Sequence, residues 1–113
     1  MSAFQIKVET KGGIALVKVG GYLDAKTFEQ MEEALNKLFE SSHYKIIIDL
    51  SSVDYISSAG AGVFIGAIST AQENEGNIIL LNPTDNVKEV FDLLGLSQIF
   101  KFASGLEEAK HAF

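Results

Sequence analysis

One short run of this sequence gathers the side chains that could do chemistry. It reads Asp54-Tyr55-Ile56-Ser57-Ser58-Ala59-Gly60-Ala61-Gly62 and lies between two apolar stretches. The two hydroxyl groups therefore fall where a strand is expected to end and a helix to begin. The first N–H groups of a helix lack intrahelical partners and carry partial positive charge, so they favour a side-chain oxygen or a phosphate. Ser57 and Ser58 are thus candidates for capping the helix or for carrying a phosphate.

The glycines beside these serines need a physical reason, because each glycine inside a helix costs roughly 1 kcal/mol relative to alanine. Two reasons remain open for Gly60 and Gly62. Either the helix packs tightly on the sheet there, or a phosphate or partner surface approaches the backbone closely. For Gly66, one turn beyond Gly62, we expect tight packing against the sheet.

Nucleotide-binding motifs do not fit the same segment. Gly60-Ala61-Gly62 follows an expected strand and opens an expected helix, as in a dinucleotide fingerprint, but Ile65 occupies the position of the third glycine. No lysine follows to make a phosphate-gripping loop. We therefore predict no bound cofactor.

Metal binding and hydrolysis are also weakly supported. Asp24, Asp49 and Asp54 could imitate a magnesium site, but an acid at a strand end or turn is more often a cap or turn former. The sequence has no cysteine, and neither His43 nor His111 lies near a recognisable nucleophile elbow. We predict that the chain has no metal site and is not an enzyme.

Length, charge and hydropathy limit the remaining functions. The 113 residues suit one domain, residues 1–113, and the nine basic and fifteen acidic residues give a net charge of -6. This charge opposes binding to nucleic acid or anionic lipid. The longest apolar runs, such as residues 63–68, are far short of the roughly 20 residues that span a bilayer. We expect a cytoplasmic protein with no nucleic-acid or membrane partner.

The elements that position the serines begin with a hairpin. Apolar and polar residues alternate over residues 4–9, and Gly12-Gly13 separates them from residues 14–19, which predicts two antiparallel strands. Apolar residues then recur at helical spacing over residues 28–39. Thr27 and Gln30 form a plausible capping box at the start of that helix.

The remaining pattern alternates strands and helices. Residues 45–50 and 77–81 are apolar runs typical of parallel strands covered on both faces, and residues 58–74 form the helix between them. A helix after Pro83, an edge strand over residues 99–102 and a short helix over 106–111 complete the chain. We predict an α/β fold: a mixed sheet with an antiparallel N-terminal hairpin and about four helices packed mainly on one face.

Two segments resemble a known family. Residues 46–63 strongly resemble the signature of STAS domains, specifically the bacterial anti-sigma factor antagonists, and Gly21-Tyr22-Leu23-Asp24 resembles that family's second motif. The resemblance covers nearly the whole chain. In the family, a cognate anti-sigma serine kinase, an ATPase of the histidine-kinase-like type, phosphorylates a serine at the start of the second helix. The unphosphorylated protein binds that kinase and releases a sigma factor, so the resemblance implies the fold, function and partners of this switch.

By position, the resemblance implies that Ser58 is the phosphoacceptor, with Ser57 as the alternative, and that a serine phosphatase acts on phosphorylated Ser58. The partner-binding residues that it implies are Asp24, Ser57, Ser58, Ala59, Gly60, Ala61 and Gly62.

Three departures from the common family pattern bear on the partner. Ser57 replaces a frequent aspartate, Ala59 replaces a second hydroxyl residue, and Ala61 replaces a leucine that could have given a partner more apolar contact area. Kinase specificity is therefore open. An alternative hypothesis has the same fold but no control of a sigma factor. The chain would then be a stand-alone STAS subunit that docks onto a transporter ATPase or a signalling complex, with Ser58 only a helix cap.

Overall fold

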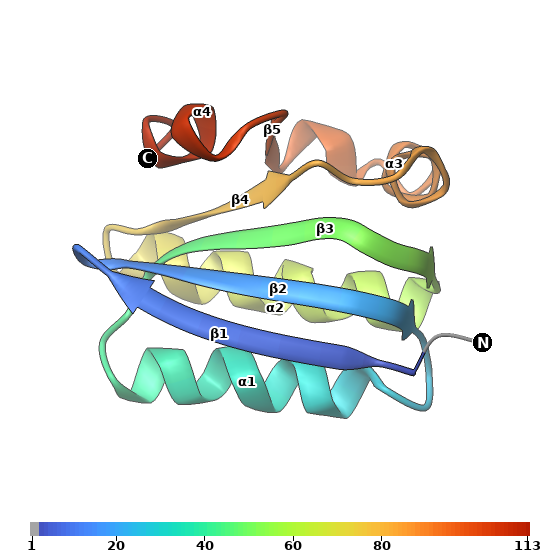
Figure 1. Cartoon of the computed structure of the whole chain (residues 1–113), viewed down its shortest axis with the longest axis horizontal. Helices are drawn as coiled ribbons and strands as arrows, with labels where there is room; N and C mark the ends of the chain where they lie inside the picture. The colour runs from blue at the N-terminus through green and yellow to red at the C-terminus, as the bar shows by residue number, and fades with distance from the viewer. Residues whose placement is uncertain (1–2) are drawn as a thin grey trace.

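A five-stranded sheet with the order β1-β2-β3-β4-β5 organises the chain (Figure 1). The computed structural model describes residues 3–113. β1 (Gln5–Lys11) pairs antiparallel with β2 (Ile14–Leu23), and β3 (Lys45–Ile56), β4 (Asn77–Leu81) and β5 (Lys101–Ala103) continue the sheet in parallel. This arrangement confirms the predicted mixed sheet with an antiparallel N-terminal hairpin.

Three helices cover one face of the sheet. They are α1 (Phe28–Glu40), α2 (Ser58–Glu73) and α3 (Asp85–Leu93), and a short 3-10 turn, η1 (Leu96–Gln98), follows α3. Their buried side chains join the sheet in one core, which includes Val17, Met31, Ile48, Phe64 and Phe91. α4 (Leu106–Lys110) packs on the opposite face, where Ala109 meets Ile47, Ile79 and Leu81. The prediction of helices packed mainly on one face is confirmed.

Several expected strand boundaries are wrong. β2 runs to Leu23 rather than ending at residue 19, because residues 20–23 still pair with β3. β3 runs to Ile56 rather than ending at residue 50, because its polar residues 51, 52, 54 and 55 are exposed while Val53 and Ile56 remain in the core. β5 covers Lys101–Ala103 rather than residues 99–102, because residues 96–100 turn back after α3 and bury Phe100 in the core. Within residues 3–113, no helix combines the length and the apolar character that crossing a membrane requires.

Candidate functional site

The carboxyl ends of β2 and β3 meet the starts of α1 and α2 at one end of the sheet (Figure 1). The Ser57 N–H donates to the Leu23 carbonyl oxygen over 3.0 Å, which ties the start of α2 to the end of β2. The Thr84 hydroxyl donates to the Val53 carbonyl oxygen over 3.2 Å, which ties the start of α3 to the same end of β3. Three connecting segments therefore meet where the two serines lie.

The two serines have different roles in the local structure. Ser57 is the N-cap of α2, and its Oγ accepts a hydrogen bond from the Gly60 N–H over 3.1 Å. Ser58 is the first helical residue; it is exposed, and within residues 3–113 its hydroxyl has no hydrogen-bond partner. The N–H groups of Ser58 and Ala59 also have no partner in the part of the chain that the structure describes. Ser58 thus offers a free hydroxyl beside free backbone donors.

Replacing Ser57 by alanine should destabilise the fold, since it removes the oxygen that satisfies the Gly60 N–H. We expect Ser57→Ala to lower the free energy of unfolding by about 1 kcal/mol, the usual cost of losing a serine cap. Urea denaturation followed by circular dichroism measures the loss. Ser58→Ala is the matched control and should change stability by less than about 0.5 kcal/mol, as expected for an exposed side chain. A larger loss for Ser58→Ala than for Ser57→Ala would contradict this division of roles.

Asp24 lies in a tightly bonded loop between β2 and α1. Its backbone N–H donates to Thr27 Oγ1 and its Oδ1 accepts the Lys26 N–H, both over 2.9 Å. The Thr27 hydroxyl in turn donates to the Tyr22 carbonyl oxygen over 2.8 Å. The predicted capping box of Thr27 and Gln30 is therefore wrong, because the Thr27 side chain closes the loop behind it and makes no side-chain cap on α1. This loop holds Asp24 in place beside Leu23, whose carbonyl oxygen accepts the Ser57 N–H.

The glycines near Ser58 divide between the interior and the surface. Gly60 is buried, and a Cβ there would lie 2.5 Å from the Leu23 carbonyl oxygen, so tight packing explains this glycine. Ala61 is fully buried, so the idea that its small side chain reduces a partner's contact area is wrong. Gly62 and Gly66 are exposed, and a Cβ at either would have open space within 4 Å. Tight packing therefore does not explain Gly66, contrary to expectation.

The partner surface predicted from the sequence thus loses two of its residues. Asp24, Ser57, Ser58, Ala59 and Gly62 reach the surface at least in part. Gly60 and Ala61 face inward and cannot present side-chain area to another protein. The structure brings Asp24 and the serines to the same end of the sheet, although they are far apart in the sequence.

Comparisons with known proteins identify the family of the chain. The family model of the STAS domain matches residues 5–109. An anti-sigma-B factor antagonist of Staphylococcus epidermidis is 31% identical over 91 residues, which cover 80% of this chain and 84% of that protein. The chain belongs to the STAS family of anti-sigma factor antagonists.

Solved structures show the same STAS fold. An anti-sigma factor antagonist from Mycobacterium paratuberculosis superposes with a TM-score of 0.88 at 24% identity, covering 97% of this chain and 93% of that one. The Bacillus cell fate determinant SpoIIAA in its phosphorylated form superposes with a TM-score of 0.73 at 24% identity. The superposition covers 98% of this chain and 100% of that one. At these identities the likeness concerns the fold.

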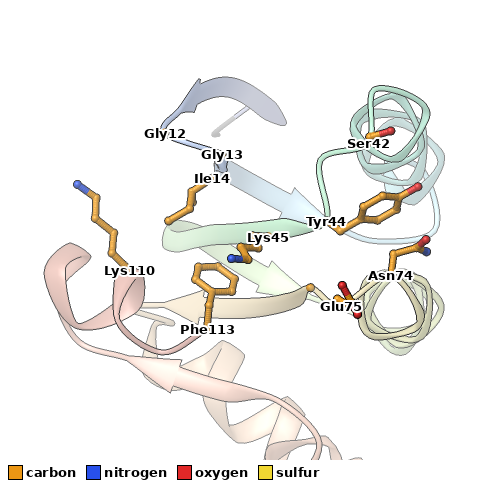
Figure 2. A pocket seen from close by; sticks show the side chains of 11 residues that line it. Gly12, Gly13, Ile14, Ser42, Tyr44, Lys45, Asn74, Glu75, Lys110 and Phe113 are labelled. Atoms are coloured by element: carbon orange, nitrogen blue, oxygen red, sulfur yellow. The ribbon is translucent and has the colours of Figure 1, made fainter.

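A separate hollow of about 420 Å³ lies at the opposite end of this STAS domain (Figure 2). The turn between β1 and β2, the segments before β3 and β4, and the C-terminal residues line it. Tyr44, Lys45, Glu75, Lys110 and Phe113 are among its side chains. No sequence-predicted site residue contributes to this hollow, so it plays no part in the site around Ser58.

Proposed function

We propose that this STAS protein is a switch controlled by phosphorylation of Ser58. In the unphosphorylated form it binds a cognate anti-sigma serine kinase, an ATPase of the histidine-kinase-like type, and thereby releases a sigma factor. Phosphorylation by that kinase ends the binding, and a serine phosphatase restores it. The names of the relatives support the antagonist role, and the fold is shared with a protein solved in its phosphorylated form.

The environment of Ser58 is the observation that carries this proposal. A phosphoserine adds about -1.5 to -2 charge at neutral pH and three acceptor oxygens. Here the first turn of α2 contains no acidic residue, and the Ser58 and Ala59 N–H groups are free within residues 3–113. Charge at such a helix start is stabilised by roughly 0.3–1 kcal/mol at a surface. The folded domain can therefore carry the phosphate without rearrangement.

The complex with a kinase would not tolerate the same charge. The surface that we assign to the kinase consists of Asp24, Ser57, Ser58, Ala59 and Gly62, with Ser58 at its centre. A partner that covers this surface must remove water from the phosphate, and an unpaired buried charge costs several kcal/mol. The same modification is thus compatible with the fold and incompatible with the interface.

Mapping the phosphate tests the proposal directly. Each histidine-kinase-like anti-sigma factor of the source organism is incubated with the chain and ATP, and the product is digested for mass spectrometry. We expect phosphate on Ser58 in the wild-type chain and in Ser57→Ala, and none in Ser58→Ala. Phosphate on Ser57, or labelling that survives in Ser58→Ala, would reject Ser58 as the acceptor. Complete absence of phosphoryl transfer would instead favour a docking subunit without sigma control.

A further inference from the structure

Two tyrosines form an exposed aromatic pair at the same end of the sheet. Tyr22 at the end of β2 and Tyr55 at the end of β3 are 47% and 48% exposed. Their ring centroids lie 5.8 Å apart at an interplanar angle of 48°. Exposed tyrosines in contact present a large apolar area with little rotamer freedom to lose, a combination that is enriched at the centres of protein interfaces. We call these two residues the tyrosine pair.

An irregularity in the sheet creates the tyrosine pair. Gly21 pairs with Val53, but Tyr22 pairs with Tyr55, so Asp54 is an extra residue on β3. In an unshifted register Tyr22 would lie beside Asp54 and the rings would not be neighbours. Such bulges often re-aim side chains next to functional sites. Gly21 has a φ of +87° and a Cβ there would lie 2.6 Å from the Ala3 carbonyl oxygen, so the backbone holds this geometry.

The tyrosine pair points away from the helix-covered core. Leu23 and Ile56, the residues that follow the tyrosines, are buried in that core. Because successive side chains of a strand alternate between faces, the tyrosine rings lie on the opposite face. α4 packs on β4 and β5 of this face, where Ala109 meets Ile79 and Leu81. The rings therefore stay about half exposed.

Two carboxylates are close to the tyrosine pair along the chain. Asp54 directly precedes Tyr55, and Asp24 lies two residues after Tyr22. Within residues 3–113, neither carboxylate takes part in an ion pair. The faces of aromatic rings carry negative partial charge and attract the cationic groups of arginine and lysine. Rings and carboxylates together therefore favour a cationic side chain of a partner.

The tyrosine pair lies at the same end of the sheet as Ser58. Tyr55 lies two residues before Ser57, and the Ser57 N–H is bonded to the carbonyl oxygen of Leu23, the residue after Tyr22. We propose that the tyrosine pair extends the kinase-binding surface and receives an arginine or lysine side chain of the anti-sigma kinase. This inference rests on the proposed function and adds residues and a partner chemistry to it.

The inference is tested by substitutions that distinguish the aromatic ring from apolar volume alone. The double variant Tyr22→Leu/Tyr55→Leu keeps apolar volume and removes the rings, whereas Tyr22→Phe/Tyr55→Phe keeps the rings. The affinity of each for the kinase that binds the wild-type chain is measured by calorimetry with ADP present. We expect the leucine variant to bind roughly tenfold or more weakly and the phenylalanine variant to stay within about threefold. Phe113→Leu is the control, because it removes an exposed aromatic ring at the opposite end of the molecule. This variant should bind the kinase as tightly as the wild-type chain does.

The possible failures are distinguishable. If no histidine-kinase-like anti-sigma factor of the source organism binds the wild-type chain, the proposed function fails and takes this inference with it. If the wild-type chain binds and the leucine variant binds within twofold of it, only the inference fails. Equal losses in the leucine and phenylalanine variants, or a similar loss in Phe113→Leu, would also overturn it. Should the double leucine variant not fold by circular dichroism, the single variants Tyr22→Leu and Tyr55→Leu decide by the same criterion.

Discussion

Ser58→Asp should weaken binding to the cognate anti-sigma kinase by about 100-fold or more, whereas Ser58→Ala should bind at least as tightly as the wild-type chain. The aspartate places a negative charge at the centre of the surface that the kinase would cover. In the unbound protein water and the free N–H groups of Ser58 and Ala59 stabilise this charge, whereas a partner that covers it removes the water. The charge therefore costs affinity and leaves the fold intact. Calorimetric titration of each variant with the kinase and ADP measures the two affinities.

A matched control separates local charge from total charge. Ser69 is exposed on α2 well beyond its first turn, so Ser69→Asp makes the same change in net charge away from Ser58. We expect Ser69→Asp to bind within about twofold of wild type, because exposed charges separated by more than about 10 Å are largely screened at 0.1 M salt. Equal affinities of Ser58→Ala and Ser58→Asp would refute the switch, and an equal loss in Ser69→Asp would attribute the effect to net charge alone.

Sequence patterns were sufficient for the sheet and for the order of its helices. The apolar runs at residues 45–50 and 77–81 are typical of strands covered on both faces, and Gly12-Gly13 between two expected strands is typical of a hairpin. Each signal is local and depends on few neighbours. The extra residue at Asp54 has no such signal, because a strand's register is set by the strand beside it. The contact between Tyr22 and Tyr55 therefore could not be predicted from local pattern.

The start of α2 was predicted correctly, but the separate roles of its two serines were not. The spacing of the motif locates the start of α2, yet it does not say which serine has the extended backbone of a cap. The structure assigns that role to Ser57, with ψ at 171°, and leaves the Ser58 hydroxyl free. The pattern also could not show which side of α2 faces the core. Residues 58–72 contain no charge, and the exposed Ile65 and Gly62 are as apolar as their buried neighbours. A helix that is apolar all round gives a weak amphipathic pattern.

Gly60→Ala should produce a large loss of stability at this site. The new Cβ would lie 2.5 Å from the Leu23 carbonyl oxygen and 2.9 Å from Leu23 Cγ, and the nearer of these atoms belongs to the backbone and cannot rotate away. α2 must therefore move off β2, which also strains the bond from the Ser57 N–H to the same oxygen. We expect the free energy of unfolding to fall by about 2–4 kcal/mol, from overpacking together with a weakened hydrogen bond. Urea denaturation at equal protein concentrations measures it.

Gly62→Ala is the matched control for this substitution, because it makes the same chemical change two residues further along α2. A Cβ at Gly62 meets no atom within 4 Å, so only the helix propensity changes, and stability should rise by about 0.5–1 kcal/mol. Opposite signs for the two variants would mean that Gly60 is retained to seat α2 on Leu23, which in turn fixes the distance between Asp24 and Ser58. If Gly60→Ala were as stable as Gly62→Ala, α2 would not be held against β2, and a partner surface built from both elements would lose its physical basis.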